Sequence, residues 1–291
     1  MEISVIREID PRVHISDKAR IGPYCTIGPD VSIDAGTIVK DRVTIVGRTI
    51  IGKNNVIEHG SVLGAFPQDL KYQGKPTYLI IGDGNYIGPN VTAHVGTELG
   101  GYITRIGNNN FIDAAAHVAH DCYIDNNTYL APAVLLAGHI RIETGAVLEE
   151  MVGVHHFTTI GRFSKVSART AVTRDVPPFT IFGTGKENPT LPAVILGAHH
   201  EGIEKANLQK QDRDALYKAV EEIFSDGSPI RIKIDRILNQ RGVSEVVKTL
   251  CEFCLKSLSG KYGRQREAFR GKIPPEAREY LHLIDKESYE Q

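Results

Sequence analysis

Aliphatic residues recur every six positions along much of the chain. A period of six fits neither an α-helix, with 3.6 residues per turn, nor a plain strand, with a period of two. It is the spacing of solenoids in which short strands wind into a parallel β-helix, with each aliphatic side chain pointing inward. The longest unbroken run consists of Ile106, Ile112, Val118, Ile124, Leu130, Leu136, Ile142, Leu148, Val154, Ile160, Val166 and Val172.

An earlier block with the same period runs from Ile15 to Leu63. Glycine follows Ile21, Ile27 and Ile51, where we expect a tight corner that needs positive φ. The period breaks at residues 65–79 and again near 95–105, and in a solenoid such excursions often mark the binding face. We therefore predict that residues 1–192 form a β solenoid with two excursions.

The period also predicts which side chains are neighbours. If three hexads close one coil, residues 18 apart are stacked with the spacing of paired strands, about 4.8 Å. His120, Gly138 and His156 then form one column, and Asp121, His139 and Phe157 form the column beside it. These positions do not point into the core, so we expect their side chains to face outward near a corner.

The pattern changes after residue 192. From about Ile195 apolar residues have helical spacing, which predicts a small α-helical domain over 193–264, with helices near 212–224, 231–240 and 243–258. Cys251 and Cys254 form a CxxC on an apolar helical stretch, which favours core packing over a metal site. The charged tail, residues 265–291, is expected to add one more helix, and its sequence suggests no function.

Composition excludes several classes of protein. The 34 basic residues balance the 35 acidic residues, so no nucleic-acid-binding surface is indicated. The four cysteines are too sparse for a disulfide framework. No apolar run approaches the length of a membrane-spanning helix, and the N-terminal sequence MEISVIREIDPR resembles no signal peptide. A soluble cytoplasmic protein without membrane insertion is expected.

Five histidines gather in one part of the main block, several of them in register by the 18-residue count: His117, His120, His139, His155 and His156. A single outward histidine on a solenoid is usually solvated surface, but this grouping predicts a site.

The segments AAAHVAHDC, LLAGHI, VGVHHF and RDVPPF, with FPQDLKYQGKPT upstream, resemble the UDP-N-acetylglucosamine O-acyltransferases that begin lipid A biosynthesis. The resemblance covers residues 10 to about 264. It implies a left-handed parallel β-helix, a homotrimer and a helical C-terminal domain. It also implies acyl carrier protein as donor of a (3-hydroxy)acyl chain and a nucleotide-sugar as acceptor, with no metal or redox cofactor.

Acyl transfer to a hydroxyl needs a base and a donor for the developing oxyanion. Histidine suits the first task near neutral pH, which makes His120 the candidate base. Asp121 could hold its tautomer, and the Gly138 amide could meet the thioester oxygen. The resemblance implies the same roles for His120 and Gly138, with Asp121, His117, His139 and His155 nearby, and it suggests contacts to the acyl donor or acceptor at Asp69 and Lys71. We expect His117, His139, His155 and His156 to contact the substrates.

The sequence departs from the family pattern where the acceptor and the acyl chain are expected to bind. His199 and His200 stand where an arginine pair is expected to contact the nucleotide phosphates, and His156 replaces a glutamine. A different nucleotide-sugar or an amino-sugar acceptor therefore stays open. Ala168 replaces a glycine that sets acyl length in the family, which suggests a slightly shorter chain.

Two alternatives lie outside acyl transfer. The γ-class carbonic anhydrases share the hexapeptide repeat and hold zinc through histidines, which would require convergence of His117, His120 and His139. A non-enzymatic scaffold that kept the fold is the other alternative, and the presence of His120 argues against it.

Overall fold

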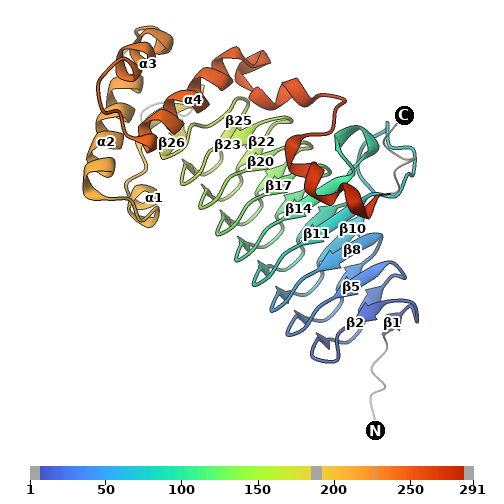
Figure 1. Cartoon of the computed structure of the whole chain (residues 1–291). Coiled ribbons are helices and arrows are strands. Elements are labelled where there is room, and N and C mark those ends of the chain that lie inside the picture. The colour runs from blue at the N-terminus through green and yellow to red at the C-terminus, as the bar shows by residue number, and fades with distance from the viewer. Residues whose placement is uncertain (1–6, 185–191, 226, 285–291) are drawn as a thin grey trace.

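The chain forms a three-sided coil of short parallel strands followed by a helical domain (Figure 1). The structure is a computed structural model, and it describes residues 7–184, 192–225 and 227–284. The coil is a left-handed parallel β-helix, which confirms the predicted fold class.

Each side of the coil is one sheet. Sheet A contains β1 (Glu8–Ile9), β4 (Thr26–Ile27), β7 (Thr44–Ile45), β10 (Val62–Ala65), β13 (Thr92–His94), β16 (His117–Val118), β19 (Leu135–Leu136), β22 (Gly153–Val154) and β25 (Ala171–Val172). Sheet B contains β2 (His14–Ile15), β5 (Val31–Ile33), β8 (Arg48–Ile51), β11 (Tyr78–Ile81), β14 (Ile103–Ile106), β17 (Tyr123–Ile124), β20 (Arg141–Ile142) and β23 (Thr159–Ile160). Sheet C contains β3 (Arg20–Ile21), β6 (Ile38–Val39), β9 (Val56–Ile57), β12 (Tyr86–Ile87), β15 (Phe111–Ile112), β18 (Tyr129–Leu130), β21 (Val147–Leu148), β24 (Lys165–Val166), β26 (Thr180–Gly183) and β27 (Val194–Ala198).

The register confirms the 18-residue stacking in the main block. His117 pairs with Leu135, and Leu135 pairs with Gly153, so each partner lies three hexads further along the chain. Across the two excursions the coil is longer. Val62 pairs with Thr92, which makes the coil with the first excursion two hexads longer than a regular one. Thr92 pairs with His117, which makes the next coil longer by one hexad and one residue. The excursions therefore leave the coil without disturbing the strands that follow.

The corners turn through single residues with a left-handed backbone. In the main block these residues lie three positions after the inward aliphatic residue, and they are Asn109, Ala115, Asp121, Asn127, Ala133, His139, Gly145, Met151, Phe157, Phe163 and Arg169. The expectation that glycines after Ile21, Ile27 and Ile51 supply positive φ was wrong. Their backbones are ordinary, and at Gly22 the reason for glycine is space, because a Cβ there would lie 2.6 Å from the Lys40 carbonyl carbon.

The aliphatic residues of the repeat fill the interior of the coil, where nearly all are buried. Cys25 and Cys122 occupy small inward positions among them and are also buried. Burial of this continuous apolar column supplies the main stabilisation of a solenoid, since each coil covers the next.

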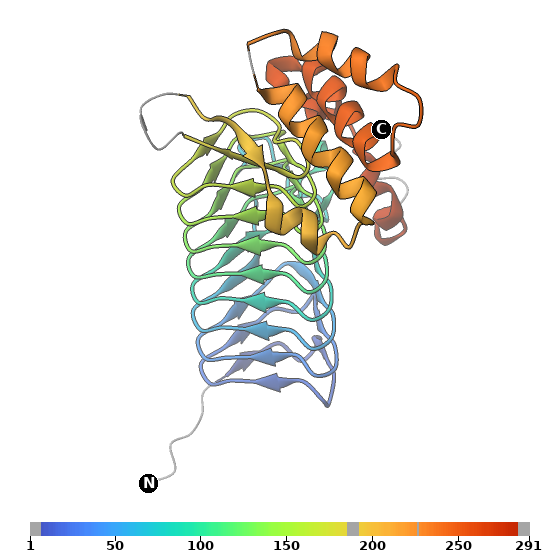
Figure 2. The same ribbon diagram turned by 90° about the vertical axis from the view of Figure 1, so that its left-hand side faces the viewer.

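The helical domain caps the C-terminal end of the coil (Figure 2). The helical pattern expected from about Ile195 begins instead at His200, because Val194–Ala198 form β27, which pairs antiparallel with β26. The helices are α1 (His200–Lys205), α2 (Lys210–Phe224), α3 (Ile230–Leu238) and α4 (Glu245–Ser259). They confirm the three helices predicted from spacing, and Cys251 and Cys254 are buried in their shared core, as predicted.

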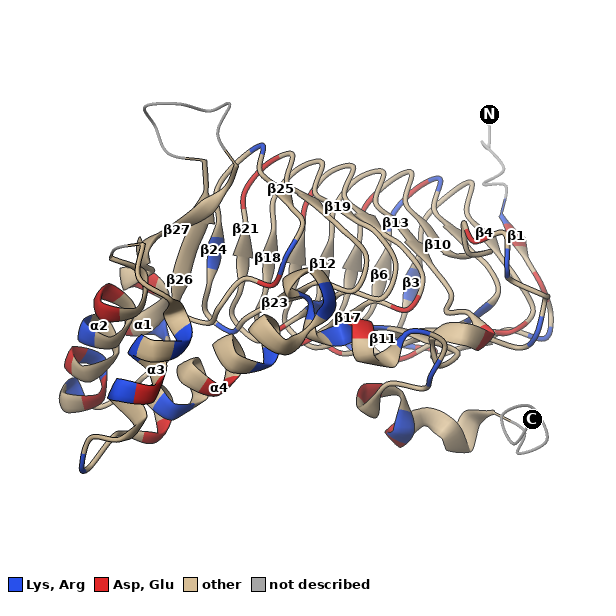
Figure 3. Cartoon of the chain, turned by 90° about the horizontal axis from the view of Figure 1, so that it is seen from above, with Lys and Arg blue, Asp and Glu red and all other residues tan. Residues whose placement is uncertain are grey.

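The described part of the tail, residues 265–284, adds helical structure as predicted, but of the 3₁₀ type. After η2 (Lys261–Gly263) it contains two 3₁₀ helices, η3 (Gln265–Phe269) and η4 (Pro275–Leu283). It turns back from α4 and runs along sheet B beside β17 and β11 (Figures 1 and 3). We call residues 264–284 the strap. Among the described residues no helix combines the length and apolarity that a membrane span requires.

Candidate active site

A cleft opens on the outer face of sheet A, along β16, β19, β22 and β25. We call it the histidine cleft. Its floor is apolar because the outward positions of successive strands hold small or aliphatic residues. Histidines line one edge of the cleft. The lining residues are Gln68, His117, Ala119, His120, Leu135, Leu136, Ala137, Gly138, Gly153, Val154, His155, His156, Ala171, Val172 and Thr173.

His120 and Asp121 form a buried pair at the corner between sheets A and B. Neighbours on a strand point to opposite faces, but Asp121 has φ +60°, and this left-handed turn brings the two side chains together. His120 Nδ1 lies 2.7 Å from Asp121 Oδ2, and the residues are 4% and 0% exposed. Because a carboxylate accepts, Nδ1 carries the proton and donates it, which leaves the lone pair of Nε2 free.

The second excursion fixes the Asp121 carboxylate. The Thr97 backbone N–H donates to Oδ1 at 2.8 Å, and its hydroxyl donates to Oδ2 at 2.6 Å. A Cβ on Gly100 would lie 1.9 Å from the Asp121 Cγ, so the backbone of η1 (Glu98–Gly100) lies directly on the carboxylate. The period breaks at this excursion, so no repeat position indicated the role of Thr97.

Gly138 lies one coil beyond His120, as the column map predicted. A Cβ at this position would lie 2.5 Å from His120 Cε1 and 2.8 Å from Nε2, so the imidazole packs against the glycine backbone. The Gly138 N–H donates to His156 Nδ1 at 3.1 Å, one coil further on. The candidate base and the candidate amide donor are therefore adjacent, and the amide N–H is already hydrogen-bonded to His156.

His139 lies behind the His120–Asp121 pair. Its Nδ1 is 3.7 Å from Asp121 Oδ2, and its ring stacks on Phe157 with 4.3 Å between centroids. Burial lowers the pKa of His139 to about 4, although Asp121 opposes this shift. His139 is therefore neutral at pH 7, so it cannot supply a positive charge to a ligand there.

This pKa predicts how stability depends on pH. Between about pH 6.5 and pH 4 the unfolded chain binds a proton at His139 that the folded chain does not, so unfolding becomes easier as pH falls through this window. The destabilisation from His139 reaches about 3 kcal/mol once the pH lies below both pKa values. Urea unfolding of the wild type and of His139→Asn at pH 7, 5.5 and 4 measures it. Asparagine tolerates the φ of +63° at this corner. If the free energy of unfolding fell equally in both proteins between pH 7 and pH 4, the prediction would be contradicted.

His117 and His94 form a second histidine pair. His117 Nδ1 lies 2.7 Å from Thr92 Oγ1, and its ring meets His94 edge to face, with centroids 5.2 Å apart. His94 donates from Nδ1 to the Phe66 carbonyl at 2.5 Å, and burial lowers the pKa of each imidazole. The sequence pattern did not single out His94, because it lies in the interval between the two regular blocks.

Other predicted residues lie away from the His120–Asp121 pair. Asp69 and Lys71 belong to the first excursion, which reaches the cleft through Gln68, and Asp69 Oδ1 accepts the Lys71 backbone N–H at 2.9 Å. Ala168 lies at the corner between sheets C and A, outside the lining of the cleft, and its N–H donates to Glu149 Oε2 at 3.0 Å.

The two histidines expected to bind nucleotide phosphates lie at the corner between sheets B and C. His199 is buried and donates from Nδ1 to the Phe163 carbonyl at 2.7 Å, and burial lowers its pKa. His200 is exposed and stacks on Tyr217, with ring centroids 4.7 Å apart. Within one chain neither residue joins the histidine cleft.

A metal would have to compete with existing contacts. Ligand atoms of His120, Asp121 and His139 lie within 4.8 Å of one another. However, both Asp121 oxygens accept hydrogen bonds from Thr97, and Oδ2 also accepts the His120 Nδ1–H. His117, which the zinc alternative required, is not among the grouped ligands in the described part of the chain. The donor set fits a proton-transfer site better than a zinc site.

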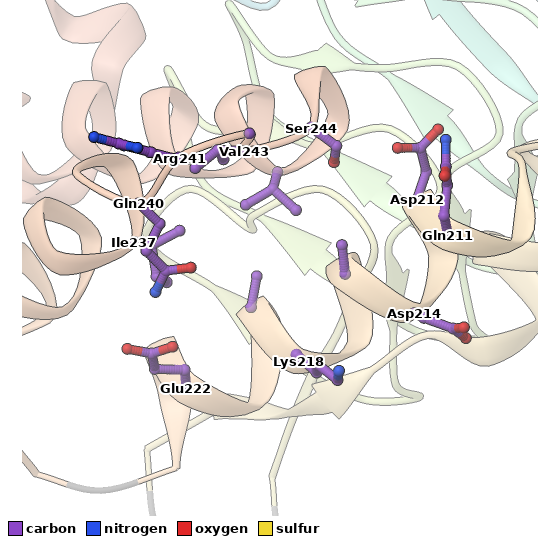
Figure 4. Close-up of a pocket in the computed structure, with 14 residues that line it drawn as sticks. Gln211, Asp212, Asp214, Lys218, Glu222, Ile237, Gln240, Arg241, Val243 and Ser244 are labelled. Atoms are coloured by element: carbon purple, nitrogen blue, oxygen red, sulfur yellow. The ribbon is translucent and has the colours of Figure 1, made fainter.

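A second hollow lies in the helical domain, between α2 and the connection from α3 to α4 (Figure 4). Asp212, Asp214 and Lys218 on α2 line it together with Gln240 and Arg241 from the connection. Its lining holds no histidine or cysteine, so it offers neither an imidazole base that titrates near pH 7 nor a thiol. We therefore assign the chemistry to the histidine cleft.

Comparisons with known proteins agree with this assignment. Residues 103–138 match the family model for the bacterial transferase hexapeptide (six repeats), and residues 175–262 match the model for UDP-N-acetylglucosamine O-acyltransferase, domain 2. The UDP-N-acetylglucosamine acyltransferase of Francisella novicida has a similar structure, with a TM-score of 0.80 and 28% identity over 98% of this chain and 97% of that chain.

Two curated relatives give the family. The acyl-[acyl-carrier-protein]–UDP-N-acetylglucosamine O-acyltransferase of Nautilia profundicola is 41% identical over 210 residues, which cover 72% of this chain and 78% of the relative. The protein of the same name from Thermodesulfovibrio yellowstonii is 35% identical over 252 residues, covering 87% and 95%. With this level of identity over most of both chains, the chain belongs to the family of acyl-[acyl-carrier-protein]–UDP-N-acetylglucosamine O-acyltransferases.

Proposed function

We propose that the chain transfers a 3-hydroxyacyl group from acyl carrier protein to the sugar 3-hydroxyl of UDP-N-acetylglucosamine, the first step of lipid A biosynthesis. Its relatives are named for this donor and this acceptor. The observation that carries the proposal is the buried His120–Asp121 pair, packed against the Gly138 backbone at one end of an apolar cleft.

His120 is the general base in this proposal. As the sugar hydroxyl attacks the thioester carbonyl, its proton passes to Nε2, which has a free lone pair because Nδ1–H is held by Asp121. Asp121 also stabilises the imidazolium that results. When the tetrahedral intermediate collapses, the carbon–sulfur bond breaks and the leaving thiolate takes the proton from His120.

The Gly138 N–H is the proposed oxyanion donor. In the structure it donates to His156 Nδ1, so the thioester oxygen has to displace this imidazole. His156 lies on the surface and can turn away at little steric cost. An amide already fixed in the coil is well suited to the role, because it needs no reorganisation when the oxyanion forms.

The apolar floor accommodates the acyl chain. From His117 the same outward column continues through Leu135, Gly153 and Ala171, three coil steps or about 14 Å. A shorter acyl chain because of Ala168 remains a prediction, and so do the substrate contacts of Asp69, Lys71, His117 and His155.

A homotrimer is part of the proposal. His199 and His200 lie at a different corner of the coil from His120, so they could reach a nucleotide in the histidine cleft only from another copy of the chain. A cytoplasmic location also remains a prediction from the sequence.

An acyl-transfer assay tests the proposal. The purified protein is offered 3-hydroxyacyl carrier proteins of several chain lengths with UDP-N-acetylglucosamine or its 3-amino analogue, and the products are identified by mass. We expect an ester product with UDP-N-acetylglucosamine, absent with His120→Ala. If only the analogue gave a product, an amide, the proposed acceptor group would be an amine and not a hydroxyl. No product from either acceptor would refute the proposal.

A further inference from the structure

The strap is fastened along sheet B by contacts from end to end. At its start the Gln265 N–H donates to Asp175 Oδ2 at 2.8 Å, and near its end the Tyr78 hydroxyl donates to the Leu283 carbonyl at 2.8 Å. Between them Ala277 is buried in an apolar cluster with Tyr102 and Tyr123. The family model for the helical domain ends at residue 262, so the strap lies beyond it.

The strap also packs on the excursion that holds Asp121. A Cβ on Gly101 would lie 2.7 Å from Pro274 Cδ and 2.9 Å from the Ala277 Cβ. Gly101 directly follows η1, whose backbone lies on the Asp121 carboxylate. The strap is therefore part of the wall around the active site and not a separate appendage.

Two buried arginines at the start of the strap contact His139 and His155. Arg266 donates from Nε to the His139 carbonyl at 3.0 Å and from Nη1 to Glu276 Oε1 at 2.6 Å. Arg264 donates from Nη1 to His155 Nδ1, and its Nη2 lies 2.8 Å from Glu267 Oε1. Arg264 thus links the strap to His155 at the edge of the cleft, and Arg266 links it to His139 behind the His120–Asp121 pair.

The contact with Arg264 selects the tautomer of His155. A guanidinium has only N–H groups to offer, so His155 Nδ1 must accept. The His156 carbonyl lies 3.3 Å from the same nitrogen, but with Nδ1 unprotonated it receives no hydrogen bond from it. The neutral His155 ring then carries its proton on Nε2, and the cleft gains an N–H donor at this edge.

A third arginine, Arg270, lies at the surface beside Phe157 and Glu267. Arg270 places its guanidinium carbon 4.2 Å from the centroid of Phe157, which directly follows His156. It donates from Nε and Nη2 to Glu267, and its side chain is 58% exposed. Since a guanidinium has five N–H groups, several remain for a ligand.

We infer that the strap completes the acceptor site: Arg264 holds His155 as an Nε2–H donor, and Arg270 provides the positive charge that contacts the diphosphate of the nucleotide-sugar. This inference rests on the proposed function. Arginine suits the task because its planar fork can donate two hydrogen bonds to phosphate and stays charged at any physiological pH. It would also supply the charge that the buried His199 does not.

Binding of UDP itself tests the role of Arg270. The dissociation constant is measured by calorimetry for the wild type, Arg270→Gln, Arg270→Lys and Arg278→Gln. Arg278 is an exposed arginine elsewhere on the strap, so this variant controls for loss of one charge. We expect Arg270→Gln to bind UDP roughly tenfold more weakly, with partial recovery in Arg270→Lys and no change in Arg278→Gln.

The same variants separate this inference from the proposed function. In the acyl-transfer assay Arg270→Gln should raise the KM for UDP-N-acetylglucosamine by a similar factor, with the KM for the acyl donor unchanged. Equal UDP affinity in Arg270→Gln and Arg278→Gln would overturn the role of Arg270, whether or not the wild type transfers acyl groups.

The role of Arg264 has its own measurement. Nitrogen chemical shifts of His155 in the folded wild type should report the Nε2–H tautomer, and Arg264→Gln should shift the population toward Nδ1–H. An unchanged tautomer in the folded variant would show that Arg264 does not set it.

Discussion

Replacing His120 by alanine is expected to lower kcat by about 10²- to 10⁴-fold, the usual contribution of a positioned general base. The KM of each substrate should change by less than about threefold, because the imidazole acts on the hydroxyl proton in the transition state. The variant should fold. Asp121 keeps both hydrogen bonds from Thr97, and the lost hydrogen bond costs about 1–2 kcal/mol of a typical 5–15 kcal/mol.

Steady-state kinetics with both substrates, alongside His14→Ala, checks this expectation. His14 is an exposed histidine on β2, far along the coil from the cleft, so its loss should leave kcat unchanged. If a folded His120→Ala protein kept more than about a tenth of the wild-type kcat, general-base catalysis by His120 would be excluded.

The column geometry could be predicted because, in a solenoid with a regular repeat, the position of a side chain on the coil follows from its residue number. A step of three hexads placed His120, Gly138 and His156 in one stack, and the structure joins them through direct contacts. The count did not predict that His120 and Asp121 converge. That contact depends on the left-handed backbone of Asp121, which is set by the corner and not by the strand.

The rest of the site comes from segments without a period. Thr97 approaches Asp121 from an excursion, and Arg264 approaches His155 from a segment far away in sequence. Such contacts depend on tertiary packing, which no local pattern encodes. His199 shows a further limit: resemblance to a family motif suggested a phosphate ligand but could not predict that its Nδ1 donates to the Phe163 carbonyl, which leaves only Nε2 for such a contact.

Replacing Gly138 by alanine should be nearly as damaging to catalysis as losing the base. The new Cβ would lie 2.5 Å from His120 Cε1, far inside van der Waals contact, and the ring cannot retreat easily because Asp121 holds its other side. Displacement of a catalytic group by about 1 Å costs on the order of 10²-fold in rate, so we expect at least that loss in kcat. Alanine keeps the backbone N–H, so the loss reports the position of His120.

A double-mutant cycle separates this cause from general damage. Gly28→Ala is the matched control, because its Cβ would meet only ordinary contacts, the nearest at 3.5 Å, in a coil remote from the cleft. If Gly138 acts through His120, the variant that combines Gly138→Ala with His120→Ala should be no slower than His120→Ala alone. If the losses in kcat of the two single variants instead multiply in the double variant, the glycine supports the reaction by another route, such as the fit of the thioester beside its amide.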